Sequence, residues 1–132
     1  MKRLYKEIQD KFNTDLSGFK TAVGRLFYAH VPPETKQPYA ILHCISDLSA
    51  DTFTETINSI VLQCDVYTDS DSSGSCHDAL KSAISFFTKI VFEPAGFANV
   101  RFIKDRVEHP RREHKLWRGS VDIRAVVEQT QD

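Results

Sequence analysis

Residues 57–68, INSIVLQCDVYT, have the clearest strand pattern in the sequence. Side chains alternate between two faces there, as they do in a β-strand. The apolar face holds Ile60, Leu62, Cys64 and Val66, and the polar face holds Ser59, Gln63 and Asp65. At about 3.3 Å per residue these twelve residues would extend for about 40 Å, which is longer than a typical strand. We therefore expect this strand to bend, or to project as a hairpin arm that contacts a partner.

The patterns on either side of this strand predict two helices and four further strands. Apolar residues recur at helical spacing over residues 3–12 and 76–91. Strand patterns occupy the ranges 25–31, 39–45, 100–107 and 116–127. The order α-β-β-β-α-β-β predicts an α+β fold, with a mainly antiparallel β-sheet and the helices packed on one of its faces. The length predicts a single domain over residues 1–132.

Local signals predict where some of these elements end. The strand over residues 25–31 should stop at Pro32-Pro33, because proline cannot donate a hydrogen bond to a strand ladder. Residues 15–18 interrupt the first helical pattern. Ser75 and Asp78 have the spacing of a capping box, which predicts that the second helix begins there.

The charges are almost balanced in number but unevenly distributed along the chain. The formal net charge is −1, so we expect no bulk attraction to nucleic acid or anionic lipid. Residues 37–80 nevertheless contain seven acids and no Lys or Arg. Residues 101–118 contain seven Lys or Arg and three acids. The sequence therefore predicts one acidic region and one basic region.

Targeting and membrane signals are not evident in the sequence. No stretch approaches the roughly 20 apolar residues of a transmembrane helix, and the first residues lack the apolar segment of a signal peptide. The three cysteines, Cys44, Cys64 and Cys76, are odd in number and far apart. This pattern favours buried thiols in a reducing compartment over a disulfide framework.

Cysteine and histidine residues have neither metal-ligand nor catalytic spacing. The adjacent pairs His43-Cys44 and Cys76-His77 do not place two ligands on one face of an element. Cys76 lies near a predicted helix start, which favours a thiolate, but His77 would point about 100° away and is badly placed as a base. The five glycines are isolated and form no phosphate-binding loop. We predict no catalytic residue, no metal site and no cofactor.

The basic stretch HPRREHKLWR, residues 109–118, allows three interpretations. It could be a solvated hairpin loop. It could bind nucleic acid as part of the segment 101–118, with arginines on phosphates and the aromatic ring stacked on a base. It could also dock onto a protein, because Arg and Trp are enriched at interface hot spots. We favour docking, because the complementary acidic region exists in the same chain.

This complementarity predicts self-assembly. The candidate contacts are Asp69 and Asp71 in the acidic loop, and Arg111, Arg112 and Trp117 in the basic hairpin. A contact between two different surfaces of successive copies is heterologous, and it closes into a ring where the rotation between copies allows.

Several segments also carry a resemblance to a known family. In chain order they are Gly24–Tyr28 before Pro32-Pro33, Pro38–Ile41, Leu62–Thr68, the helix around Ala79-Leu80, and Trp117–Ile123. Their order and spacing resemble the tail-completion (tail-terminator) proteins of long-tailed bacteriophages and prophages over nearly the whole chain.

The resemblance implies a virion assembly protein and not an enzyme. Such a protein would cap the head-proximal end of the tail tube, stop its polymerisation and form the head-joining surface, as a ring of six copies. The implied partners are other copies of the chain, the tail tube protein and the head–tail connector protein, with DNA passing through the ring. The implied location is the virion tail, and the host cytoplasm during assembly. A head-completion or connector protein and a small nucleic-acid-binding module are the alternatives.

Overall fold

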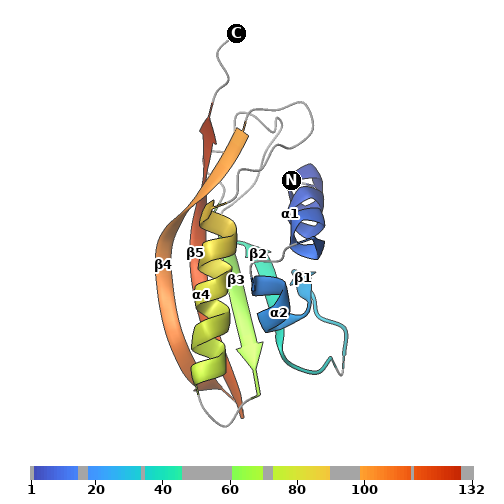
Figure 1. The fold of residues 1–132 in the computed structure, drawn as a ribbon, viewed down its shortest axis with the longest axis vertical. Helices are drawn as coiled ribbons and strands as arrows, with labels where there is room; N and C mark the ends of the chain where they lie inside the picture. Colours follow the sequence, from blue (N-terminus) through green and yellow to red (C-terminus); the bar gives the residue numbers. More distant parts are fainter. Residues whose placement is uncertain are drawn as a thin grey trace.

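A five-stranded sheet with three helices on one of its faces forms the described part of the protein (Figure 1). This computed structural model describes residues 2–14, 18–33, 35–45, 61–69, 73–89, 99–113 and 115–128. The elements in order are α1 (Lys2–Asn13), α2 (Phe19–Val23), β1 (Leu26–Tyr28), β2 (Tyr39–Cys44), β3 (Val61–Thr68), α4 (Gly74–Lys89), β4 (Asn99–Glu113) and β5 (Leu116–Glu128). The predicted α+β class is confirmed.

The strands are arranged in the order β1-β2-β3-β5-β4. The pairing of β1 with β2 is parallel, and the other three pairings are antiparallel. Cys64 in β3 lies opposite Leu42 on one side and Val121 on the other. Asp65 lies opposite Ile41 and Ser120. Because directly opposed residues point to the same face, these two rows lie on opposite faces of the sheet.

The face that the helices cover is the apolar one, as the alternation in residues 57–68 predicts for its described part. Leu62, Cys64 and Val66 are fully buried. A stripe of α4 packs over this face and contributes Cys76, Ala79, Leu80, Ala83, Phe86 and Phe87. Their spacing of three and four residues places them on one side of the helix. The sheet and α4 therefore bury each other's apolar surface.

Five buried phenylalanines join the helices to the far strand of the sheet. The ring of Phe19 lies 5.2 Å from that of Phe12 and 5.2 Å from that of Phe86, measured between centroids. The ring of Phe87 lies 6.0 Å from that of Phe102 in β4. Each fully buried Phe contributes about 1.5–3 kcal/mol of transfer free energy. This cluster fixes α1, α2 and α4 together on the sheet.

The short helix α2 was missing from the sequence-based prediction of two helices. It has five residues, too few for a helical period to be visible in the sequence. Gly18 and Gly24 flank it with φ values of 116° and 73°, which favour glycine. Phe19 and Val23 are both fully buried, so tertiary packing holds this helix in place.

Two strand ends differ by more than one residue from the prediction. β1 ends at Tyr28 and not at residue 31, because Ala29 adopts a left-handed backbone with φ of 60°. β4 continues past residue 107 to Glu113, through register shifts at Lys104/Arg106 and Glu108/Arg111. Much of the predicted basic loop is therefore paired strand. The longest described strands are those of the β4–β5 hairpin, with 15 and 13 residues, against 8 residues in β3. Residues 57–60 lie outside the described part, so the bend or arm expected for the strand over 57–68 stays a prediction.

The start of α4 also differs, and a glycine lets this helix approach the sheet closely. The helix begins at Gly74, and the N–H of His77 donates to the carbonyl of Ser73. Ser75 is therefore inside the first turn, and the predicted capping-box start is wrong by two residues. A Cβ at Gly119 in β5 would lie 3.1 Å from a methyl group of Leu80. Glycine at this position thus sets the distance between α4 and β5.

Candidate assembly surfaces

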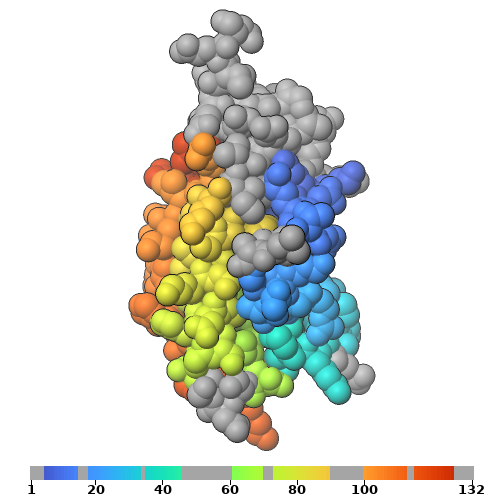
Figure 2. Space-filling model, viewed as in Figure 1, coloured from blue at the N-terminus to red at the C-terminus, as the bar shows by residue number. Residues whose placement is uncertain are grey.

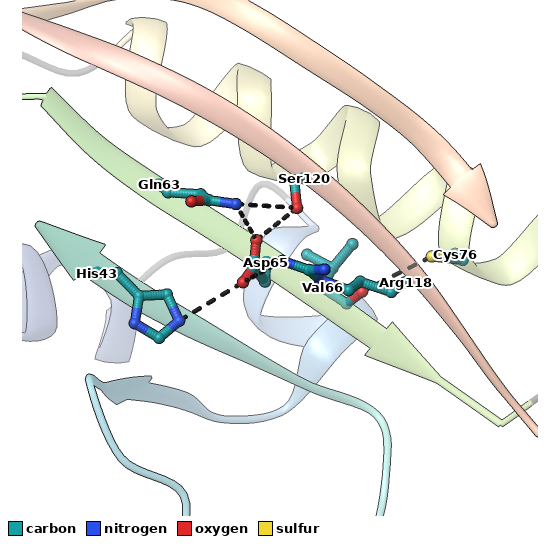
Figure 3. A network of polar contacts seen from close by, with 7 residues as sticks. All are labelled: His43, Gln63, Asp65, Val66, Cys76, Arg118 and Ser120. Atoms are coloured by element: carbon teal, nitrogen blue, oxygen red, sulfur yellow. Dashed lines mark hydrogen bonds and ion pairs between the residues drawn. The ribbon is translucent and has the colours of Figure 1, made fainter. Parts of the chain in front are cut away.

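A charged network lies on the helix-free face, which we define as the sheet face opposite the three described helices (Figure 3). Oδ2 of Asp65 accepts from Arg118 Nη2 at 3.2 Å and lies 3.5 Å from His43 Nε2. Oδ1 of Asp65 accepts from Gln63 Nε2 at 3.0 Å and from the hydroxyl of Ser120. Three neighbouring strands, β2, β3 and β5, therefore supply donors to one carboxylate.

The sequence places Asp65 on the polar face of its strand, but its exposed fraction is only 3%. A buried carboxylate is stable when charged or polar donors occupy its oxygens, and here four side chains do so. The useful signal in the sequence was the position of an acid inside the apolar run VLQCDVYT. The partners could not be read from it, because Ser120 and Arg118 are more than fifty residues away along the chain.

A row of two tyrosines and two arginines crosses one end of the helix-free face. Tyr39, Tyr67, Arg118 and Arg111 are opposed in turn on β2, β3, β5 and β4. The rings of Tyr39 and Tyr67 are stacked, with centroids 5.3 Å apart. Arg118 is bound to Asp65, whereas Arg111 is exposed at the outer strand. Like charges directly opposite each other destabilise a strand pair, so an anionic partner at Arg111 would be favourable.

Arg112 and Trp117 lie on the other side of the same hairpin. Trp117 is opposite Thr68 in β3 and opposite Arg112 in β4, on the face that the helices cover. The Arg112 guanidinium carbon is 5.5 Å from the centre of the Trp117 ring, within the range of a cation–π contact. Trp117 is half-buried and packs against the core. The structure therefore separates Arg111 from Arg112 and Trp117, although the sequence groups them.

Asp69 lines a recess at the same end of the molecule. The recess has a volume of about 190 Å³ and lies among α2, the start of β2, the end of β3 and the start of α4. We call it the Asp69 recess; its lining residues are Ala22, Pro38, Thr68, Asp69 and Ser75. Asp69 is exposed, and Asp71 lies outside the described residues. In the space-filling view the tip of the β4–β5 hairpin emerges below the start of α4 (Figure 2).

Comparison with known proteins gives the family. The model of the family described as tail completion protein gp17 matches residues 14–128. The chain belongs to this family. The match includes β1 to β5, α2 and α4, and it confirms the resemblance on which the sequence-based interpretation depended. None of the curated proteins matches the chain.

Two solved structures share the fold of this family member. One is from the virion of a native gene transfer agent particle, with a TM-score of 0.66 and 19% sequence identity. That similarity covers 96% of this chain and 95% of the other. The second has a TM-score of 0.62 and 13% identity, over 99% of this chain and 94% of the other. At these identities the two structures support the fold alone.

Membership in the tail-completion family assigns the chain a structural role in completing phage tails, as a component associated with the virion. The family is one of structural phage proteins, which supports the expectation of a non-enzymatic function. The residue-level choices, namely Asp69, Asp71, Arg111, Arg112 and Trp117, stay predictions.

The described residues were also compared with the requirements of a metal site, a reactive thiol and a membrane span. Within this part of the chain, no three His, Cys, Asp or Glu side chains gather as metal ligands would. Burial raises the pKa of the Cys76 thiol, which opposes thiolate formation at the start of α4. No helix among the described residues is long and apolar enough to cross a membrane.

Proposed function

We propose that this tail-completion protein caps the head-proximal end of the tail tube. In this role it ends polymerisation of the tube and forms the surface that joins the tail to the head. The observation that carries the proposal is the family match over residues 14–128. Its partners are then the tail tube protein, the head–tail connector protein and other copies of the chain. It acts in the virion tail after assembly in the host cytoplasm.

We propose further that the acting form is a ring of six copies, through which DNA passes. A ring needs two different surfaces on each copy, and these must be complementary. The chain has an exposed arginine on the helix-free face and an acid-lined recess on the helix side. These two surfaces are candidates for the contact between neighbouring copies.

The experiment is electron microscopy of particles from the parent phage or prophage with this gene disabled, and with the gene supplied from a plasmid as the control. The proposal expects filled heads lying apart from tails, and tubes of abnormal length. Supplying the gene should restore joined particles with tubes of normal length.

The same experiment separates the alternatives. Tails of normal length beside unjoined or leaking heads would indicate a head-completion or connector protein. Intact, infectious particles would overturn the assembly role. They would favour a nucleic-acid-binding module that uses residues 101–118, whose DNA affinity should fall steeply with salt.

A further inference from the structure

We infer that Arg111 of one copy docks into the Asp69 recess of the next copy. This inference rests on the proposed ring and names the contact that would hold successive copies together. It commits to a second copy of this chain as the occupant of the recess. The reasons are the shape and charge of the recess, the surroundings of Arg111, and the faces on which the two lie.

The recess fits the end of an arginine side chain. Its volume of about 190 Å³ corresponds to roughly six water molecules at about 30 Å³ each. Ala22 and Pro38 offer apolar wall for the methylene stem, and Asp69 offers a carboxylate. The hydroxyl of Ser75 is a further acceptor for the N–H groups of a guanidinium.

Arg111 is an exposed arginine near the tip of the hairpin, where it can reach another molecule. It is exposed on the outer strand β4 and lies opposite Arg118, a second positive charge. Arg118 already pairs with Asp65 at 3.2 Å. A carboxylate from outside would offset the repulsion between the two guanidinium groups.

The sheet itself prevents the contact from forming within one chain. Arg111 shares the helix-free face with Tyr67 and Arg118, whereas the Asp69 recess opens among α2, α4 and the strand ends on the helix side. A contact between opposite faces of two copies is heterologous, which is the type that closes into a ring. Arg112 is a poorer candidate, because it lies on the helix side over Trp117.

The test is a charge exchange in the phage gene, read as the yield of joined particles by electron microscopy. Asp69→Arg and Arg111→Asp should each lower the yield about tenfold or more, since each reversal places two like charges at the contact. The double variant Asp69→Arg/Arg111→Asp should restore most of the yield. Circular dichroism and thermal melting of each purified variant would show that it folds.

Two matched controls come from the same strand. Arg112→Asp changes the neighbouring arginine on the opposite face, and Arg101→Asp changes an exposed arginine at the far end of β4. Neither should be rescued by Asp69→Arg. Specific rescue of Arg111→Asp would therefore assign the contact to this pair of residues.

Other outcomes would overturn the inference without touching the proposed function. Normal yields from both single variants would show that another surface joins the copies. A folded double variant that stays as defective as the single variants would show that the two residues do not meet. Loss of DNA binding at low salt in Arg111→Asp, but not in Asp69→Arg, would mean that Arg111 binds phosphate instead. Failure of the proposed function would appear differently, as normal particles in the absence of the whole gene.

Discussion

At the scale of single residues, Asp65 stands out because its ionisable carboxylate is buried within the sheet. An acid in the middle of a sheet normally loses more hydration than it gains from contacts. Here Arg118, His43, Gln63 and Ser120 surround its two oxygens. The carboxylate therefore joins β2, β3 and β5 by polar contacts, next to the row that ends in Arg111.

Replacing Asp65 by Asn should destabilise the protein by about 3 kcal/mol, because it leaves the partly buried Arg118 without its counter-charge. Urea unfolding followed by circular dichroism would measure the change. Asp69→Asn removes an exposed acid from the end of the same strand and should change the free energy of unfolding by at most about 0.5 kcal/mol. Equal effects of the two substitutions would contradict this account of the network.

The buried thiols predict how stability depends on pH. Burial raises the pKa of Cys64 and of Cys76, whereas a thiol in the unfolded chain titrates near pKa ~8.5. The native state thus favours the neutral thiols, and their contribution is complete below about pH 8.5 and is lost as the pH rises above it. We expect the free energy of unfolding to fall between about pH 8.5 and 10.

The control for this dependence is Cys64→Ala, which removes one of the two titrating groups. Its free energy of unfolding should fall less steeply with pH than that of the natural sequence. Denaturant titrations at several pH values would show the difference, and identical slopes would assign the pH dependence to other groups.

At the scale of elements, long periodic segments were predictable from the sequence and short or long-range features were not. The patterns of α1, α4 and β3 identified both their type and their buried face. The helix α2 could not be predicted, because five residues are too few to show a helical period. Its position depends on Phe19 packing against Phe12 and Phe86. The extension of β4 to residue 113 could not be predicted, because this part is a strand through its pairing with β5 and has no alternation of apolar and polar residues of its own.

The close approach of α4 to β5 predicts an effect of Gly119→Val. Even a single added carbon would lie 3.1 Å from Leu80, so the larger side chain must displace the helix. Overpacking of this kind costs about 1–3 kcal/mol, which should lower the melting temperature by several degrees. Calorimetry of Gly119→Val, Leu80→Ala and the double variant should show a double-variant loss smaller than the sum of the single losses. Strictly additive losses would show that Leu80 does not crowd residue 119.

At the scale of the whole molecule, Asp69 of the acidic region lines a recess on the helix side, and Arg111 of the basic region is exposed on the helix-free face. The charge map predicted that complementary patches exist. It could not show that Arg111 and Arg112 face opposite ways, because both lay outside the predicted strands and only residues within a strand alternate between two faces. It also could not show the recess, which four separate segments build.

An interface that depends on Arg111 and Asp69 should respond to ionic strength. Screening shortens from about 10 Å at 0.1 M salt to about 3 Å at 1 M, so added salt should shift assembled protein towards smaller species. Sedimentation velocity over a range of protein and salt concentrations would measure this shift. Arg111→Asp should reduce both the assembled fraction and its sensitivity to salt. Assembly that is indifferent to salt and to this substitution would exclude a charge-based contact.

The outer strand β4 affects whether the protein can aggregate through its sheet edge. One side of this 15-residue strand ends the sheet, and such an edge is normally a template for cross-β stacking. Two register shifts, Pro110 and several charged side chains interrupt it, so an incoming strand meets no continuous ladder of N–H and C=O groups. Copies of the protein therefore have a built-in barrier against fibril seeding.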